Sequence, residues 1–320
     1  MTYILFVLGF IILIYGANKL VEGAAAIGSS FGMSQVVVGL TIVALGTSLP
    51  ELFINIIAAV KGSTDLAIGN VLGSNVVNTY LIIGVAALIY PISVSGRTAN
   101  ILIPGTIFAS AVLWVLANDS IFMRKVQEIS RWDGAVLLIF FIAFLYFTIF
   151  KPDENDADAK DVIIKKMTRG KSILFILLGA AGLYFGGDWI VSGSEKISKD
   201  LGISQSFIGL TLVALATSLP ELVTSIIAAR NKNSALAIGN AVGSNIMNIL
   251  FVLGVTSLVK PIPFYKYLNT SIWMVIIASL LLMLFVKFTG KQKNKVSRWE
   301  GALLIAAYVI FIIISAVNQG

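Results

Sequence analysis

Long apolar runs separated by short polar stretches fill most of the 320-residue chain. About 20 consecutive apolar residues are enough to cross a bilayer as a helix. By this criterion the chain has ten predicted spans, five on each side of a polar stretch at 151–170: 3–28, 35–60, 66–90, 100–117, 132–150, 171–197, 205–229, 235–259, 269–288 and 299–317. The first has no basic segment before it and no small-residue cleavage site after it, so we expect it to be retained as a helix.

The two halves of the chain repeat one another at an offset of 170 residues. Residues 39–51 read GLTIVALGTSLPE and residues 209–221 read GLTLVALATSLPE, identical at 11 of 13 positions. The segment LAIGNVLGSNVVN at 66–78 returns as LAIGNAVGSNIMN at 236–248, identical at 9 of 13. Because five spans per half is an odd number, the second half must cross the membrane in the opposite orientation, as in the inverted repeats of secondary transporters. The sequence predicts an all-α membrane protein with ten transmembrane helices, arranged as two inverted five-helix repeats.

The composition narrows the chemistry. Hydrophobic residues make up 58% of the chain and charged residues 12%, about half the charged share of a soluble domain. Cysteine and histidine are absent, which excludes disulfides, thiolate metal sites and imidazole relays. A bound metal ion must therefore be held by carboxylate, amide, hydroxyl and carbonyl oxygens, which favours hard cations such as calcium, magnesium or sodium.

Lysine and arginine are unevenly distributed between the predicted loops. Loops on the side of the 151–170 linker carry 14 of them, and loops on the side of the chain ends carry 8. The positive-inside rule then places both termini outside the cell and the linker in the cytoplasm. The net charge of +7 is therefore a topology signal rather than an indication of nucleic-acid binding. The polar composition of the linker predicts a flexible or partly helical loop.

Two carboxylates, Glu51 and Glu221, fall inside predicted spans at equivalent positions of the repeat. An ionisable residue there costs about 2.5–3.5 kcal/mol and is normally retained because it works on an ion or a proton. Two such residues at matched depth indicate one shared site.

A proline precedes each glutamate, at Pro50 and Pro220. Proline removes a backbone donor and clashes one turn back, so we expect carbonyls at 44–48 and 214–218 to lose their helical partners and become available to cations. Adjacent hydroxyls add further oxygens: Thr47, Ser48, Thr217 and Ser218. The alternative is a proline kink whose hydroxyls satisfy the backbone, beside a protonated or hydrogen-bonded carboxylate.

The third span of each half carries a stripe of small and polar residues. Ser74 and Asn78 are four residues apart and share a helix face, as do Ser244 and Asn248. The glycines of the stripe are accounted for by close helix packing alone. Other polar residues are expected to bond across helices or to pair near span ends: Asn70, Asn75, Asn240, Asn245, Lys19, Glu22, Asp188 and Glu195.

The duplicated motifs resemble the α-repeats of the cation/calcium exchanger superfamily, and most closely its prokaryotic sodium/calcium exchanger branch. The resemblance implies α-repeats at 39–78 and 209–248, within a first repeat at 1–150 and a second at 171–320. It also implies that Glu51 and Glu221 are shared carboxylate ligands and that Asn78 and Asn248 are amide ligands. The remaining implied ligands are hydroxyl or carbonyl oxygens of Thr47, Ser48, Ser74, Thr217, Ser218 and Ser244, and backbone carbonyls of Ala44 and Ala214.

Two residues depart from the family pattern. Ala216 replaces the residue equivalent to Gly46, which is expected to stiffen one broken helix. Asn248 stands where several relatives, including potassium-dependent ones, carry aspartate. The missing charge favours electrogenic transport without potassium.

We therefore expect a multi-pass antiporter of the cell membrane that exchanges sodium for calcium at a midplane site. It would have no cofactor beyond the transported Ca²⁺ and Na⁺, no covalent chemistry, no nucleic-acid ligand and no obligate protein partner. The alternatives are an exchanger of protons for calcium or other divalent cations, a cation channel with a carboxylate-lined pore, and a membrane scaffold without transport.

Overall fold

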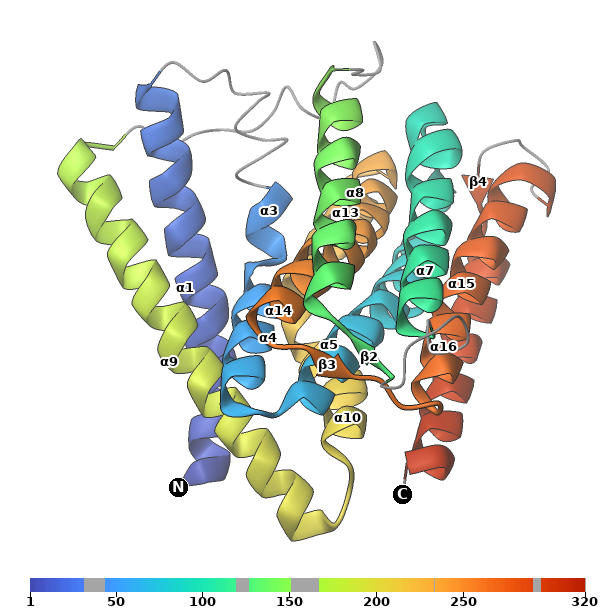
Figure 1. Ribbon diagram of the computed structural model, residues 1–320. Coiled ribbons are helices and arrows are strands. Elements are labelled where there is room, and N and C mark those ends of the chain that lie inside the picture. Colours follow the sequence, from blue (N-terminus) through green and yellow to red (C-terminus); the bar gives the residue numbers. More distant parts are fainter. Residues whose placement is uncertain (32–43, 119–126, 151–166, 233, 290–294, 320) are drawn as a thin grey trace.

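Helices form most of the residues that a computed structural model describes, which are 1–31, 44–118, 127–150, 167–232, 234–289 and 295–319 (Figure 1). Among these residues, eight helices are long and apolar enough to cross a membrane, and a bent pair makes a possible ninth span. The eight are built from α1 (Thr2–Ser30), α5 (Thr64–Val76) with η2 (Val77–Ile82) and α6 (Ile83–Ile89), η3 (Thr98–Leu102) with α7 (Ile103–Ala117), α8 (Arg131–Phe150), α9 (Arg169–Leu201), α13 (Ser234–Met247) with η7 (Asn248–Val252) and α14 (Leu253–Val259), α15 (Leu268–Leu284) with η8 (Phe285–Thr289), and α16 (Arg298–Gln319). The η segments are π-helical turns.

These helices coincide with the predicted spans to within a few residues at each end. The predicted span 35–60 is described from residue 44 onward, as α3 (Ala44–Thr47) and α4 (Leu49–Lys61). Its earlier part and most of the linker, residues 151–166, lie outside the described residues, so the predictions for them stay predictions.

The proline-containing spans are interrupted where the repeated motif predicts a break, in the first half between α3 and α4 at Ser48. In the second half, α10 (Gln205–Ile208), η6 (Gly209–Val213) and α11 (Ala214–Thr217) are followed by α12 (Leu219–Arg230) at an angle of 45°. Pro50 and Pro220 lie in the first turns of α4 and α12, where a missing backbone donor leaves no bond unmade.

The prediction that these prolines free the preceding carbonyls is wrong for the carbonyls that can be followed. The Ala214 carbonyl accepts the Ser218 amide at 3.1 Å and the Thr217 hydroxyl at 3.2 Å. The Leu45 carbonyl accepts the Ser48 amide at 3.2 Å. The turn at each serine thus keeps these two carbonyls paired.

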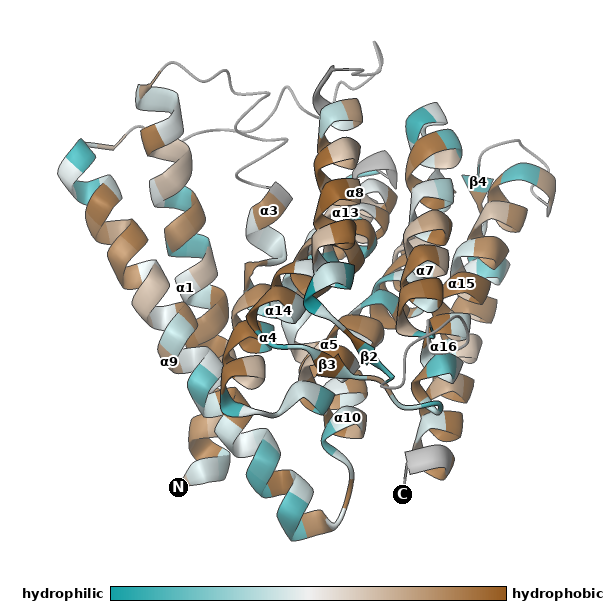
Figure 2. Ribbon diagram, viewed as in Figure 1, coloured by the Kyte–Doolittle hydropathy of each residue, from teal (hydrophilic) through white to brown (hydrophobic). Residues whose placement is uncertain are grey.

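The spans that carry the asparagine motif lie at the centre of the bundle. Within their apolar windows, 78% of residues at 64–89 and 72% at 237–259 are buried, against 28% in α1, α9 and α16. Figure 2 shows apolar residues along much of the outer helices and polar residues concentrated near their ends. The outer helices therefore present apolar side chains to the bilayer, as expected for a multi-pass membrane protein.

Some contacts between the two halves occur in matching sets: a residue of the first half contacts one of the second, and the two equivalent residues are also in contact. A Cβ atom added at Gly9 would lie 2.9 Å from the Gly186 carbonyl, and one added at Gly16 would lie 2.8 Å from the Gly179 carbonyl. Gly9 and Gly179 are equivalent positions, and so are Gly16 and Gly186. The crossing of α1 and α9 (Figure 1) therefore contains two matching contacts, each made by equivalent residues of the two halves. The glycines permit the close approach of the two backbones.

Short strands repeat the same relationship at the ends of the bundle. β1 (Ile92–Ser93) pairs with β4 (Lys295–Val296), and β2 (Glu128–Ile129) pairs with β3 (Ile262–Pro263), both antiparallel. β1 and β3 are equivalent strands of the two halves, and so are β2 and β4, so the two pairs are equivalent to each other. Two-residue strands have no periodicity to detect, so they were absent from the all-helical prediction.

Candidate cation site

Glu51 and Glu221 are both enclosed by protein, each with 1% of its surface exposed. They occupy the first turns of α4 and α12, directly after these interruptions. The negative charge of Glu51 acts on Glu221, so the two carboxylates lie near enough to repel each other. Among the described residues no three acidic side chains come together. The acidic part of the site is this pair.

Each carboxylate faces hydroxyl groups of the other repeat. Glu51 is next to the side chains of Thr217 and Ser218. Glu221 is next to Thr47 of the first half and accepts a hydrogen bond from Ser244 Oγ at 3.4 Å. The motifs that are repeated in sequence therefore face one another in space and form a single site.

Asn78 and Asn248 are also buried, with 1% of each exposed, and both lie in π-helical turns. In η2 the Asn78 carbonyl accepts the amide of Ile83, and in η7 the Asn248 carbonyl accepts the amide of Leu253, five residues on in both cases. Widened turns of this kind are frequent at functional sites. The sequence analysis did not predict these π-helical turns.

The site contains an unusual number of buried polar atoms with no hydrogen-bond partner among the described residues. They are the Oγ atoms of Ser48 and Ser218, both carboxylate oxygens of Glu51, Glu221 Oε2, and the side-chain amide atoms of Asn78 and Asn248. Leaving a buried polar group unpaired costs about 1–3 kcal/mol, and more if it is charged. Hard cations take six to eight oxygen ligands, so a cation would satisfy the oxygens in this set.

The structure describes the remaining predicted ligands unevenly. Ser74 Oγ and Thr217 Oγ1 are 3.5 Å apart, which joins α5 to α11. Ala214 is fully buried, and its carbonyl already accepts two hydrogen bonds, one for each lone pair. It would have to give up one of them to bind a cation. Ala44 begins α3. The ligand roles of all twelve predicted residues stay predictions.

Several polar residues around the site form hydrogen bonds with one another and with the predicted ligand Thr217. Asn70 donates to Asn55 Oδ1 at 3.0 Å and accepts from Thr217 at 3.3 Å. Asn245 donates to Thr79 Oγ1 at 2.7 Å, and Asn75 donates to the Asn245 carbonyl at 3.4 Å. This confirms the predicted cross-helix bonding of Asn70, Asn75 and Asn245.

Asn55 and Thr79 were missed by the sequence analysis. Asn55 follows Glu51 by four residues and is fully buried on the same helix face. Its equivalent, Ser225, is also fully buried and donates to the Ala237 carbonyl at 3.3 Å. A polar residue four positions after each motif glutamate was the signal that could have identified this position.

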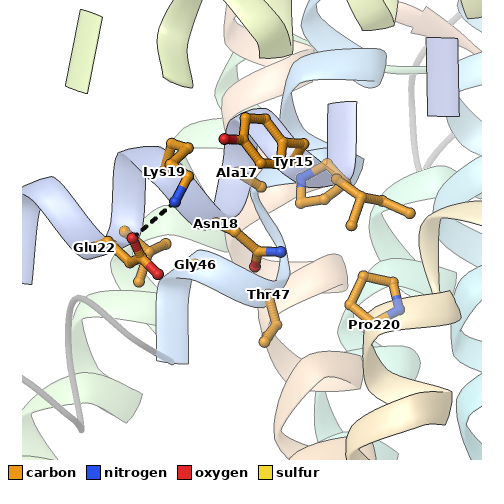
Figure 3. Close-up of a pocket in the computed structure, with 11 residues that line it drawn as sticks. Tyr15, Ala17, Asn18, Lys19, Glu22, Gly46, Thr47 and Pro220 are labelled. Atoms are coloured by element: carbon orange, nitrogen blue, oxygen red, sulfur yellow. Dashed lines mark hydrogen bonds and ion pairs between the residues drawn. The ribbon is translucent and has the colours of Figure 1, made fainter. Parts of the chain in front are cut away.

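A cavity of about 330 Å³ reaches the site from one side. Its walls come from α1, from α3 and from the two prolines, and Thr47 lines it (Figure 3). Thr47 is also the neighbour of Glu221. The cavity involves the C-terminal half of α1, whose Lys19 ammonium contacts the ring of Phe175 near the start of α9. The cavity therefore lies toward the linker side of the bundle.

The sequence model of the family described as sodium/calcium exchanger protein matches residues 1–150 and 171–317. The chain belongs to the sodium/calcium exchanger protein family. This confirms the resemblance inferred from the duplicated motifs.

Individual members of the family match over nearly their full length. The chain is 36% identical to the uncharacterized membrane protein MJ0091 of Methanocaldococcus jannaschii, covering 96% of this chain and 95% of that protein. It is 30% identical to the sodium/calcium exchanger MaX1 of Methanosarcina acetivorans, covering 98% of each. A solved structure of the sodium-calcium exchanger NCX_Mj, soaked with 2.5 mM Na⁺ and 0.1 mM Ca²⁺, superposes with a TM-score of 0.63 at 34% identity, covering 98% of this chain and 97% of that one.

Proposed function

We propose that this protein is a secondary antiporter that exchanges Na⁺ for Ca²⁺ by alternating access at a site near the bilayer midplane. The observation that carries the proposal is the buried pair Glu51 and Glu221, surrounded by oxygens that lack partners. Membership of the exchanger family and the likeness to NCX_Mj support it. The ions are the transported substrates, and no covalent chemistry is involved.

The oxygen set suits both ions. Two carboxylates carry about −2 charges, which one Ca²⁺ neutralises, while the amides of Asn78 and Asn248 add neutral oxygens. The same oxygens can be divided among several Na⁺ ions, because sodium also prefers oxygen ligands. The two ions then compete for one site, and such competition is the basis of antiport.

The architecture we propose is ten spans in two inverted repeats, at 1–150 and 171–320, with a cytoplasmic linker at 151–170 and both termini outside. The exchanged contacts of α1 with α9 and of the short strands support the repeat. Because the cavity lies toward the linker side, it would be the cytoplasmic access route. Movement of the α1 and α9 pair over the bent helices would close it and open the opposite route.

Calcium uptake by the purified protein in liposomes tests this function. Sodium-loaded liposomes diluted into sodium-free medium with labelled Ca²⁺ should accumulate calcium, and liposomes with equal sodium on both sides should not. Uptake that follows a pH gradient and ignores sodium would identify a proton/calcium exchanger instead. Flux that persists without any counter-ion would identify a channel.

A further inference from the structure

A chain of hydrogen bonds leads from the cation site into the first half of the protein. It begins at the predicted ligand Thr217, which lies next to the Glu51 carboxylate. The Thr217 hydroxyl donates to Asn70 Oδ1 at 3.3 Å. The other end of the same amide, Asn70 Nδ2, donates to Asn55 Oδ1 at 3.0 Å. All three side chains of this chain are fully buried, so water does not substitute for any of these bonds.

The direction of these bonds decides whether Thr217 can bind a cation. A hydroxyl group has one proton and two lone pairs, and only a lone pair can coordinate a cation. The proton of Thr217 is within reach of two acceptors, Asn70 Oδ1 and the Ala214 carbonyl at 3.2 Å. Thr217 is the donor toward Asn70 and toward Ala214, so neither of them uses a lone pair of its oxygen.

Asn55 opposes a reversal of the Asn70 amide. One end of an amide accepts hydrogen bonds and the other end donates them. In the reversed orientation, Asn70 Nδ2 would face Thr217 and donate to its oxygen, and a lone pair would then be lost to the cation. Asn55 Oδ1 gives Nδ2 an acceptor on its other side. Without that acceptor, the present orientation would leave a buried donor unpaired, which is unfavourable.

The second half does not repeat this arrangement. Ser225 occupies the position equivalent to Asn55, and it donates to the Ala237 carbonyl at 3.3 Å. Asn240 is the equivalent of Asn70, and its buried Nδ2 has no hydrogen-bond partner among the described residues. The repeated fold therefore forms without an acceptor for this amide. The acceptor in the first half needs another explanation than the fold alone.

We propose, on the basis of the exchange function above, that Asn55 is a positioning residue for the cation site. It holds the Asn70 amide with Oδ1 toward Thr217, and the Thr217 oxygen thereby keeps its lone pairs for Ca²⁺ or Na⁺. Asn55 acts through its acceptor atom, since its own Nδ2 is buried and has no partner in the described part of the chain. Asn55 touches no ion itself in this role, and its effect depends on the Thr217 hydroxyl.

Removing the acceptor should weaken cation binding and leave the maximal transport rate in place. Asn55→Leu should raise the Kd for Ca²⁺, measured by calorimetry on the purified protein, about three- to tenfold, the worth of one hydrogen bond. The half-saturating Ca²⁺ concentration for uptake should rise by the same factor. Asn55→Ser, whose side chain is one atom shorter, should act alike and serves if leucine prevents folding. Ser225→Ala, at the equivalent position, is the matched control and should keep the wild-type Kd. A wild-type Kd in the Asn55 variants would overturn the proposal.

A double-mutant cycle separates positioning from packing. Thr217→Val removes the hydroxyl and keeps the side-chain shape, so adding Asn55→Leu to it should not raise the Kd for Ca²⁺ further. Thr217→Ser keeps the hydroxyl, and in that background Asn55→Leu should retain its full effect. Equal fold-changes in the two backgrounds would refute the positioning role. Calcium binding by the wild type without sodium-dependent uptake would refute the exchange function, and the cycle would still decide the role of Asn55.

Discussion

Lys61 and Asp188 join the two halves of the protein by an ion pair of 2.5 Å on the side of the site opposite the cavity. The pair links the end of α4 to α9, and Lys61 also donates to Ser192 Oγ at 2.8 Å. Next to it, Ser63 donates to Glu195 Oε1 at 2.5 Å. This confirms that Asp188 pairs within the protein, as its place in the span suggested.

The repeat supplies no counterpart to this pair. The positions equivalent to Lys61 and Asp188 are Asn231 and Asn18, and neither carries a charge. In a transporter that alternates by exchanging the conformations of its two halves, the ion pair would exist in one state and be replaced by two asparagines in the other. In such a transporter the ion pair would favour the state with the cavity open on the linker side.

We predict that Lys61→Gln shifts the protein away from that state. The two side chains are 30% and 34% exposed, so the pair contributes about 0.2–1 kcal/mol, up to roughly a fivefold change in the conformational equilibrium. Asn18 lines the cavity, and the labelling rate of a thiol introduced there by Asn18→Cys should fall by up to that factor. Lys196→Gln, at the exposed end of α9, should leave it unchanged. Faster or unaltered labelling would contradict the assignment.

Neutralising either buried carboxylate should abolish exchange. Glu51→Gln and Glu221→Gln retain the side-chain shape but remove half of the charge that compensates Ca²⁺. In wild-type protein, Ca²⁺ at about 100 times its Kd should add about 2.7 kcal/mol of stability, and in the variants this gain should be lost. Calcium uptake and melting curves with and without Ca²⁺ measure both effects, with Glu128→Gln in the distant strand β2 as control. Transport at the wild-type rate in either variant would exclude the shared site.

Gly46→Ala should damage the protein through a steric clash with α1. A Cβ atom at this position would overlap Val21 Cγ2, and overpacking of this kind costs about 1–3 kcal/mol. We expect a lower melting temperature and slower exchange, with recovery of both in the double variant Gly46→Ala with Val21→Ala. Ala216→Gly, at the equivalent position, should change stability by only about 1 kcal/mol. A lack of rescue would show that the glycine is needed for backbone freedom instead.

The linker should be reachable only from the cytoplasm. The excess of basic residues in its half of the loops, 14 against 8, implies this orientation. A thiol introduced by Ala157→Cys should react with an impermeant reagent in inside-out vesicles and remain unlabelled in intact cells. Labelling from outside would reverse the topology, and it would also move the access cavity to the external face.

The spans and the two central glutamates could be predicted because each produces a strong local signal. A bilayer demands long apolar runs, and a carboxylate inside such a run is conspicuous, the more so when it recurs after 170 residues. Asn55 escaped because its equivalent is Ser225, so the repeat search did not mark the position. The re-paired carbonyls were misjudged because the turn at Ser218 depends on backbone geometry that proline alone does not specify.

Interactions between residues far apart in sequence could not be predicted from the hydrophobic pattern or from the repeat. Lys61 and Asp188 are 127 residues apart, and only the packing of α4 on α9 brings them together. The cavity between α1, α3 and the two prolines is likewise a feature that no single helix defines. The sequence identified the residues that the two halves share, and the structure adds the contacts that differ between the halves.

The charge of the site leads to a prediction about voltage and potassium. With Glu51 and Glu221 ionised and Asn78 and Asn248 neutral, one Ca²⁺ balances the site, and three Na⁺ leave about +1. Exchange of three sodium ions for one calcium ion would then move net charge across the membrane. We expect calcium uptake into sodium-loaded liposomes to respond to a clamped membrane potential and to be unaffected by potassium.

The variant Asn248→Asp provides the matched test of that charge count. It adds one negative charge at a side chain that is buried and whose amide atoms have no hydrogen-bond partner among the described residues. A third carboxylate would leave the calcium-bound site at about −1, so a further monovalent cation would be needed to balance it. We expect calcium uptake by this variant to be slower and to be stimulated by potassium, while the wild-type protein shows no stimulation. A potassium requirement in the wild type, or voltage-independent uptake, would show that the neutral asparagine does not set the charge of the site.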